Sequence, residues 1–190
     1  ALAFFNNWDG VFIEGDSKKF ADLQENYVEK KNILTVNAWV GIEGNERLDV
    51  LLRERVPTEF GILSIDIDGN DYHVWESLVD FTPTVVIIEI NPSIPNDVFF
   101  VQRYDKRVNQ GASLLATSSL ANAKGYDLIC CTSQNAFFIK KEFTERFEVK
   151  FSSLDEIYVP KCNGRIFHGY DGTVFVVGMD RIIWKSRPVS

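Results

Sequence analysis

Apolar and polar residues follow a repeating strand–helix pattern over the first 90 residues of the chain. Four short apolar runs bounded by turn residues predict buried strands: Val11–Glu14, Ile33–Asn37, Ile62–Asp66 and Val85–Ile90. Between these runs, apolar residues recur at helical spacing within charged segments, which predicts amphipathic helices. Strands that alternate with helices are typical of crossover connections and a parallel sheet covered on both faces. The pattern therefore predicts an α/β fold.

Three helices are expected between the predicted strands. The first covers 17–31, and Asp16 is placed to act as its N-cap. The second carries Leu48, Leu51 and Leu52, and the third carries Val74, Trp75 and Leu78.

The pattern changes after Asn91. The segment from Pro92 to Gly111 is polar, broken and too long for an ordinary connection, so we expect a loop over a site. A helix is predicted over 112–124, with Ser113 as its N-cap.

The rest of the chain completes the predicted domain. A hairpin is expected from two strands, 126–131 and 136–139, and an edge strand at 173–177. We expect one domain over residues 1–190, with 1–150 as its core and 151–190 as a C-terminal extension that packs on it.

Composition and charge exclude several classes of protein. The chain has 190 residues, with 20 Lys and Arg against 27 Asp and Glu and a net charge of −7, which argues against a nucleic-acid binder. Its apolar runs are far shorter than the roughly 18 residues that span a bilayer. Three cysteines, Cys130, Cys131 and Cys162, fit neither a disulfide framework nor a zinc site. We interpret the first two as buried apolar residues, and the set favours a cytoplasmic location.

Each of the four predicted strands ends in a polar residue. These are Glu14, Asn37, Asp66 and Glu89. Because ligands bind at the carboxyl ends of strands in an open parallel sheet, four such ends indicate one shared crevice.

The residues around these strand ends carry a resemblance to a known family. Four segments, Phe12–Asp16, Val36–Gly41, Leu63–Asp71 and Ile87–Pro92, resemble successive strand ends of the FkbM-like S-adenosylmethionine-dependent methyltransferases. The similarity covers about residues 8–139. It implies a class I methyltransferase fold, a seven-stranded and mostly parallel sheet with one antiparallel strand near its edge. It also implies S-adenosylmethionine as cofactor and a hydroxyl of a sugar, glycan or small metabolite as acceptor.

The same resemblance assigns the cofactor residues. Glu14 is expected to hold the ribose hydroxyls, and Asn37 with Ala38 to lie beside the adenine. Asp66 with Asp68 is expected to face the methionine end and the substrate.

Candidate catalytic and substrate residues follow from their places near the crevice. Asp66, Asp68 and His73 are candidates for the base or for orienting the substrate. The pattern around His73 favours a surface or partly buried helix position over a role as base. The residues expected to contact the substrate are Glu89, Asn91, Asn109 and Gln110.

One feature of the family is absent from the sequence. The family's glycine-rich cofactor loop follows its first strand, and no Gly-x-Gly signature precedes Glu14. That first strand is central in the fold, between the strands predicted at Val11 and Ile62. We therefore expect a longer native protein, or another chain that supplies the strand. The alternative is an inactive, methyltransferase-like structural subunit of an assembly.

Asp66 and Asp68 also suggest a metal site. A calcium loop of the EF-hand type needs Gly and Glu where this sequence has Asp71 and Ser77, so that type is excluded. A two-carboxylate magnesium or manganese site stays open, and our site assignment includes no metal.

Overall fold

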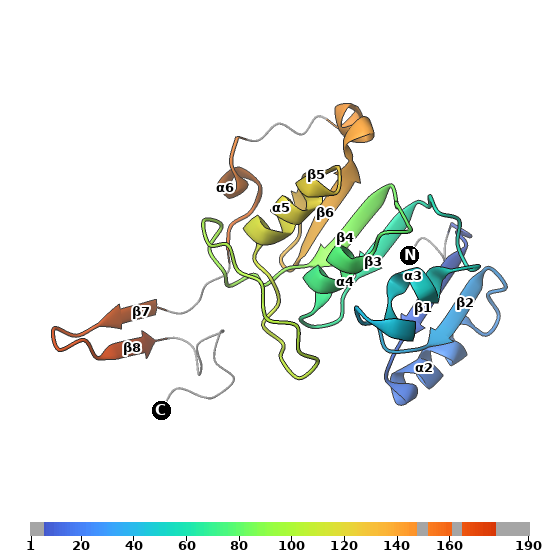
Figure 1. Ribbon diagram of the computed structural model, residues 1–190, viewed down its shortest axis with the longest axis horizontal. Coiled ribbons are helices and arrows are strands. Elements are labelled where there is room, and N and C mark those ends of the chain that lie inside the picture. Colours follow the sequence, from blue (N-terminus) through green and yellow to red (C-terminus); the bar gives the residue numbers. More distant parts are fainter. Residues whose placement is uncertain (1–5, 148–151, 161–164, 178–190) are drawn as a thin grey trace. The chain divides into compact units, whose positions relative to one another are not determined.

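The computed structural model describes residues 6–147, 152–160 and 165–177 (Figure 1). The described chain forms two compact units. The first contains the residues up to Phe60 together with His73–Thr82, and the second contains Gly61–Tyr72 and the residues from Pro83 onward. The expectation of one domain with an extension from residue 151 stays a prediction.

The first unit is built on a parallel strand pair. Strand β1, Gly10–Glu14, pairs with β2, Ile33–Asn37, in a register that sets Glu14 opposite Asn37. Helix α2, Ser17–Tyr27, connects the two strands, as the apolar spacing predicts.

Helix α2 has the predicted N-cap but is shorter than expected. Asp16 accepts hydrogen bonds from the backbone N–H groups of Lys18 and Lys19, at 2.8 and 3.0 Å. The helix ends at Tyr27 because the backbone then turns into β2, with Lys30 N–H bonded to the Tyr27 oxygen and Ile33 N–H bonded to the Lys30 oxygen.

A buried carboxylate organises the rest of the first unit. Its elements are η1 (Gly44–Glu46), α3 (Leu48–Leu52) and the part of α4 (Asp71–Ser77) from His73 onward. Asp49 on α3 accepts from the backbone N–H groups of Val79 and Asp80 and from the Arg47 guanidinium, at 2.7–3.0 Å. These bonds hold the pKa of Asp49 below its ordinary value although burial opposes them.

The second unit contains a mixed four-stranded sheet in the order β3–β4–β6–β5 (Figure 1). Strands β3 and β4 are parallel, and β6 is antiparallel to both β4 and β5. Two successive antiparallel pairings give β5 the same direction as β3 and β4. The strands are β3 (Ile62–Ile65), β4 (Val85–Glu89), β5 (Tyr126–Cys131) and β6 (Asn135–Lys140).

The core of this unit comes from the alternation of residues along the strands. Val86 and Ile88 on β4, and Ala136 and Phe138 on β6, are fully buried. Residues two apart on a strand share a face, so these side chains lie on one face of the sheet. Helix α5, Leu114–Ala123, packs on β5, and its predicted N-cap Ser113 accepts from Ala116 N–H at 3.2 Å.

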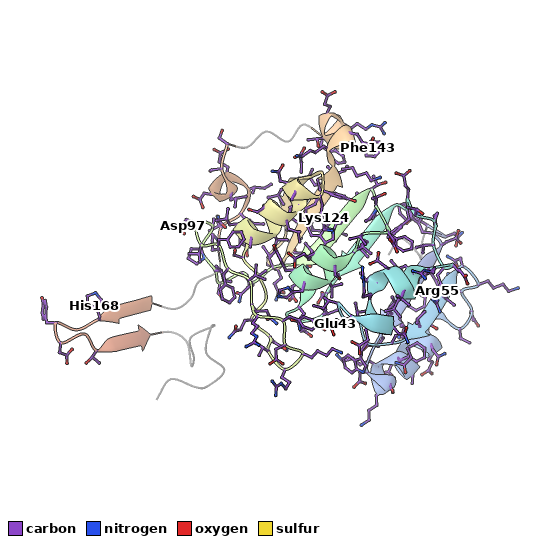
Figure 2. All side chains as sticks on the ribbon, viewed as in Figure 1. Glu43, Arg55, Asp97, Lys124, Phe143 and His168 are labelled. Atoms are coloured by element: carbon purple, nitrogen blue, oxygen red, sulfur yellow. The ribbon has the colours of Figure 1, made fainter. Side chains whose placement is uncertain are left out.

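Shorter elements complete the described chain. They are η2 (Lys141–Arg146), α6 (Leu154–Ile157) and the antiparallel hairpin of β7 (Arg165–His168) with β8 (Val174–Val177). Figure 2 marks Lys124 just after α5 and the exposed His168 at the end of β7. The expected strand at 173–177 is confirmed as β8. In the described ranges, no helix has the length and apolar character needed to cross a membrane.

The α/β class is confirmed, but the single continuous sheet is not what the described residues form. Strands β1 and β2 make one parallel sheet, and β3, β4, β6 and β5 make a separate mixed sheet. Within the ranges that the structure describes, each of β1 and β3 has a strand partner on one side alone. The family resemblance expects its first strand beside both β1 and β3, and that strand stays a prediction.

The interpretation of the cysteines needs a correction. Cys130 is exposed rather than buried, and Cys131 is partly exposed. The physical reason is an irregularity in the pairing of β5 with β6 between Leu128 and Cys130, which disturbs the alternation that the sequence suggests. Cys162 lies outside the described residues.

Candidate functional site

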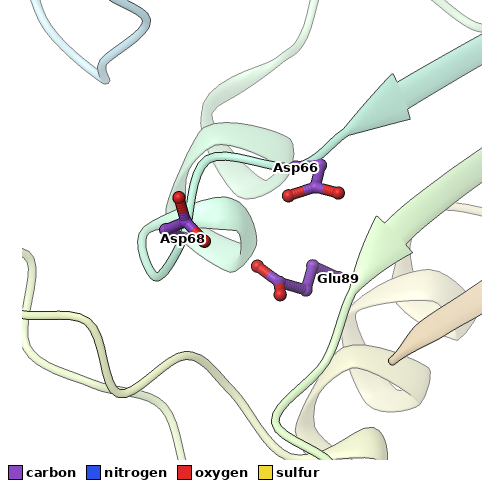
Figure 3. A group of neighbouring side chains, drawn as sticks. All are labelled: Asp66, Asp68 and Glu89. Carbon is purple, nitrogen blue, oxygen red and sulfur yellow. The ribbon is translucent and has the colours of Figure 1, made fainter. Parts of the chain in front are cut away.

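Three carboxylates meet where β3 and β4 end (Figure 3). Asp66 directly follows β3, Asp68 lies on the next turn, and Glu89 is the last residue of β4. One carboxylate oxygen from each residue lies within 4.8 Å of the others. The parallel pairing of β3 with β4 explains the meeting, because the carboxyl ends of parallel neighbours share one edge of the sheet.

A fourth carboxylate fixes the turn that carries Asp68. Asp71, at the start of α4, is 3% exposed and accepts from the backbone N–H groups of Ile67 and Gly69, at 2.9 and 2.8 Å. Asp68 has a φ of 60°, in the left-handed region that Asp tolerates better than most residues. The carboxylate of Asp71, on the helix that follows, therefore holds the turn.

A cavity of about 210 Å³ adjoins this turn. Its polar lining combines carboxylates with side-chain amides, and Gly69 and Gly111 contribute backbone. Among the residues that the structure describes, no Lys, Arg or His lines it. The polar lining residues are Asp68, Asp71, Glu89, Asn91, Asn109 and Gln110.

The concentration of negative charge changes the titration of Glu89. Burial, together with the charges of Asp71, Asp66 and Asp68, raises the pKa of Glu89 to about 7, while a hydrogen bond from the Asp68 backbone acts in the opposite direction. Burial likewise raises the pKa of Asp71, against the two backbone hydrogen bonds that favour its ionised form. Both groups therefore hold protons more tightly in the fold than in the unfolded chain.

The lining determines which ligands the cavity suits. Carboxylates and amide oxygens accept hydrogen bonds from hydroxyl or ammonium groups, and the surplus of negative charge disfavours anions. Asp66, Asp68 and Glu89 could also share a divalent cation, because hard cations take carboxylate oxygens at about 2–2.6 Å.

The first unit carries a second group of predicted residues. Asn37 donates from Nδ2 to the Glu14 backbone oxygen at 2.8 Å, and Ala38 N–H donates to the same oxygen at 3.1 Å. One carboxylate oxygen of Glu14 accepts from Asp16 N–H at 2.8 Å. The Trp39 ring lies so close to Gly15 that a Cβ there would stand 2.5 Å from it. Glu14, Asn37 and Ala38 are thus brought together at the ends of β1 and β2.

The predicted site residues therefore fall into two groups. In the second unit the structure brings together Asp66, Asp68, Glu89, Asn91, Asn109 and Gln110. Glu14, Asn37 and Ala38 form the group of the first unit. Whether one ligand contacts both groups stays a prediction.

His73 lies on α4 and is counted with the first unit. Its Nδ1 is 3.7 Å from the Glu76 carboxylate, and 18% of its side chain is exposed. This matches the helix position that the sequence leaves open, and a role as base stays a prediction.

Two buried residues at or beside the cavity were missed by the sequence reasoning. The sequence does not indicate the burial of Asp71 or its hydrogen bonds to the turn. Gln102 was not singled out, although it is 2% exposed and bonds to the loop that carries Asn109 and Gln110. A polar residue inside a polar loop carries no signal of burial.

Comparison of the chain with protein-family models, with curated proteins and with solved structures finds no match.

Proposed function

We propose that the chain is an S-adenosylmethionine-dependent methyltransferase domain that methylates a hydroxyl oxygen of a sugar or small metabolite. The observation that carries the proposal is the meeting of Asp66, Asp68 and Glu89 at the ends of parallel strands, beside a cavity lined by amides. The strand directions also support it, since β3, β4 and β5 run the same way and β6 alone is reversed, next to the edge.

The proposed reaction needs a hydroxyl oriented toward the donor methyl and a group that takes its proton. The acceptor oxygen forms a bond to the methyl carbon while the carbon–sulfur bond breaks, so the sulfonium becomes a neutral thioether. The hydroxyl proton passes to a carboxylate. Most of the rate gain comes from holding donor and acceptor at attack distance away from water.

Among the clustered carboxylates, Glu89 is best placed to take the proton. It lines the cavity and is half-buried, whereas Asp66 and Asp68 are exposed. Asn91, Asn109 and Gln110 offer amide groups that can orient the other hydroxyls of a sugar-like acceptor.

In the first unit, Glu14 is suited to the cofactor ribose. A bidentate bond from a carboxylate to two adjacent hydroxyls is the use that nucleotide-binding folds make of an acidic residue after a strand. Asn37 and Ala38 lie against the same strand end and would flank the adenine.

The test is binding of S-adenosylmethionine by calorimetry, followed by transfer of a labelled methyl group to a panel of sugars and polyols. Binding together with transfer to a neutral hydroxyl acceptor is the expected result. Because the sequence lacks the family's cofactor loop, the test uses the intact protein, together with any partner chain that supplies the missing strand. Absence of binding to that folded protein would exclude the proposed enzyme.

A structural role is the second candidate, and the separation of the two sheets favours it. Strands β1 and β3 each have one side without a strand partner in the described residues, so the fold offers backbone donors and acceptors to another polypeptide segment. A subunit of this kind would assemble with other chains and fail to bind S-adenosylmethionine, so the same calorimetry separates the two candidates.

A further inference from the structure

The loop that closes one side of the cavity is anchored by a buried glutamine. Gln102 is 2% exposed, and its neighbour Val101 forms an isolated antiparallel bridge with Ala112. Gln102 N–H also donates to the Gly111 oxygen at 3.1 Å. The backbone thus forms a narrow loop whose far side, Asn109–Gly111, lines the cavity.

The side-chain amide of Gln102 holds this loop from inside. Its oxygen accepts from the backbone N–H groups of Gln110 and Gly111, at 2.6 and 2.7 Å. Its Nε2 donates to the Val108 oxygen at 2.8 Å and to Asn70 Oδ1 at 2.9 Å. Two acceptor and two donor positions are thereby occupied, which is the ordinary capacity of a carboxamide.

The bond to Asn70 joins the loop to the turn after β3. Asn70 is 9% exposed, accepts from Asp105 N–H at 3.3 Å and donates to the Asp105 oxygen at 3.1 Å. Gly69 leaves the space that this approach needs, because a Cβ there would lie 2.9 Å from the Val108 oxygen and 3.0 Å from Gln102 Oε1. The two walls of the cavity therefore meet through Gln102 and the backbone of Gly69.

A third bond ties the loop to the end of β4. Asn91 donates from Nδ2 to the Gln110 oxygen at 2.7 Å. Gln110 is thus held from two sides, by Gln102 at its N–H and by Asn91 at its carbonyl.

We propose that Gln102 is the positioning residue of this cavity, setting the distance between the Asn109–Gly111 wall and the turn that carries Asp68. It does not line the cavity and acts through the backbone groups that it holds. Without it, the Gln110 and Gly111 N–H groups lose their acceptor, and the wall opens to water. The importance of this wall for catalysis rests on the proposed function, whereas its structure does not.

The experiment compares Gln102→Met with Asn96→Leu in the full chain. Both changes replace a buried amide by an apolar side chain of similar size. Asn96 is 8% exposed and bonds to Asp155 and the Tyr158 oxygen, and it is not a lining residue of the cavity. The pair separates a general loss of stability from a change at the cavity.

Two measurements are independent of any activity. Hydrogen exchange at the Gln110 and Gly111 amides should accelerate about tenfold or more in Gln102→Met and stay near the wild-type rate in Asn96→Leu. The pKa of Glu89, followed by carbon NMR, should fall toward its ordinary value in Gln102→Met alone, because water enters the opened cavity. Equal exchange in the two variants, or an unchanged Glu89 titration in Gln102→Met, would overturn the assignment.

A second variant keeps the test usable should Gln102→Met not fold. Gln102→Glu retains an acceptor for Gln110 and Gly111 but loses both donors. Exchange at Asp105, whose N–H bonds to Asn70, should then accelerate while Gln110 stays protected. An unchanged exchange rate at the Asp105 amide would show that Gln102 does not hold the turn.

The kinetic measurement connects this role to the proposed function. Gln102→Met should lower kcat/KM for methyl transfer by about 10–100-fold, the scale of a misplaced binding wall, and Asn96→Leu should not. A wild-type chain without methyl transfer would remove the proposed function, and the exchange and titration results would still decide the role of Gln102.

Discussion

Glu89 and Asp66 place carboxylate oxygens within 4.8 Å of each other at the ends of two parallel strands. Burial of Glu89, together with the neighbouring charges of Asp71, Asp66 and Asp68, raises the pKa of Glu89 to about 7. The fold tolerates the free-energy cost of this shifted pKa, which is typical of a carboxylate in a functional site.

The raised pKa of Glu89 predicts how stability depends on pH. Between about pH 4.5 and 7 the folded chain holds a proton on Glu89 that the unfolded chain has released, so the free energy of unfolding falls as pH rises through this window. Glu89→Gln should remove much of that fall and be more stable than the wild type at pH 8. Urea unfolding at a series of pH values measures the difference.

Glu142→Gln is the control for this prediction, because Glu142 is exposed on η2. It should show the wild-type dependence on pH. If the free energy of unfolding depended on pH in the same way for the wild type and Glu89→Gln, a raised pKa of Glu89 in the fold would be contradicted.

Removal of metal ions gives the second prediction. We expect methyl transfer to withstand EDTA, because a cation at the cluster must first displace the proton that Glu89 retains near neutral pH. Loss of activity in EDTA and its return with Mg²⁺ or Mn²⁺ would instead assign Asp66, Asp68 and Glu89 to a cation. Asp66→Asn should then weaken Mn²⁺ binding in a calorimetric titration.

Sequence reasoning located the strand ends well for a physical reason. Apolar runs with turn residues at both ends mark buried strands, and consecutive parallel strands bring their carboxyl ends to one edge. That is why Asp66 and Glu89 could be expected to meet, and why the loop with Asn109 could be expected beside them.

The parts that could not be predicted depend on tertiary contacts. Gln102 and Asp71 look like ordinary polar residues in the sequence, but both are buried and accept hydrogen bonds from backbone N–H groups of the adjoining loop and turn. Gln102 also donates to Asn70, 32 residues away in the chain. Strand β7 was missed because its four residues are too few to show a clear period. The separation of the two sheets depends on which strands pair, and no local pattern specifies that.

The buried face of the sheet gives the third prediction. Phe138 is fully buried on β6, opposite Val86 on β4 and Leu128 on β5. Phe138→Ala should lower the free energy of unfolding by about 3–5 kcal/mol through lost burial and the cavity left behind. Phe99→Ala, at a residue that is 60% exposed, should change it by less than about 1 kcal/mol. Similar unfolding midpoints for the two variants would contradict the assignment of the core.

The fourth prediction concerns Glu14 and the proposed cofactor. One oxygen of Glu14 accepts from Asp16 N–H, so Glu14→Ala would disturb the turn as well as the ligand. Glu14→Gln retains an acceptor for Asp16 and removes one carboxylate oxygen from the ribose. We expect it to weaken S-adenosylmethionine binding by about 1–3 kcal/mol in calorimetry, the scale of a lost charge-assisted hydrogen bond.

Glu25→Gln provides the matched control, because Glu25 is exposed on α2 in the same unit and the change in charge is identical. Its dissociation constant should equal that of the wild type. Equal weakening in both variants would indicate a general effect of net charge, and no weakening in Glu14→Gln would remove the ribose assignment. Glu89 belongs to the other unit. We expect Glu14→Gln to lower cofactor affinity, and Glu89→Gln to lower the rate of methyl transfer while cofactor affinity stays unchanged. These two results together would show that the two groups serve one reaction.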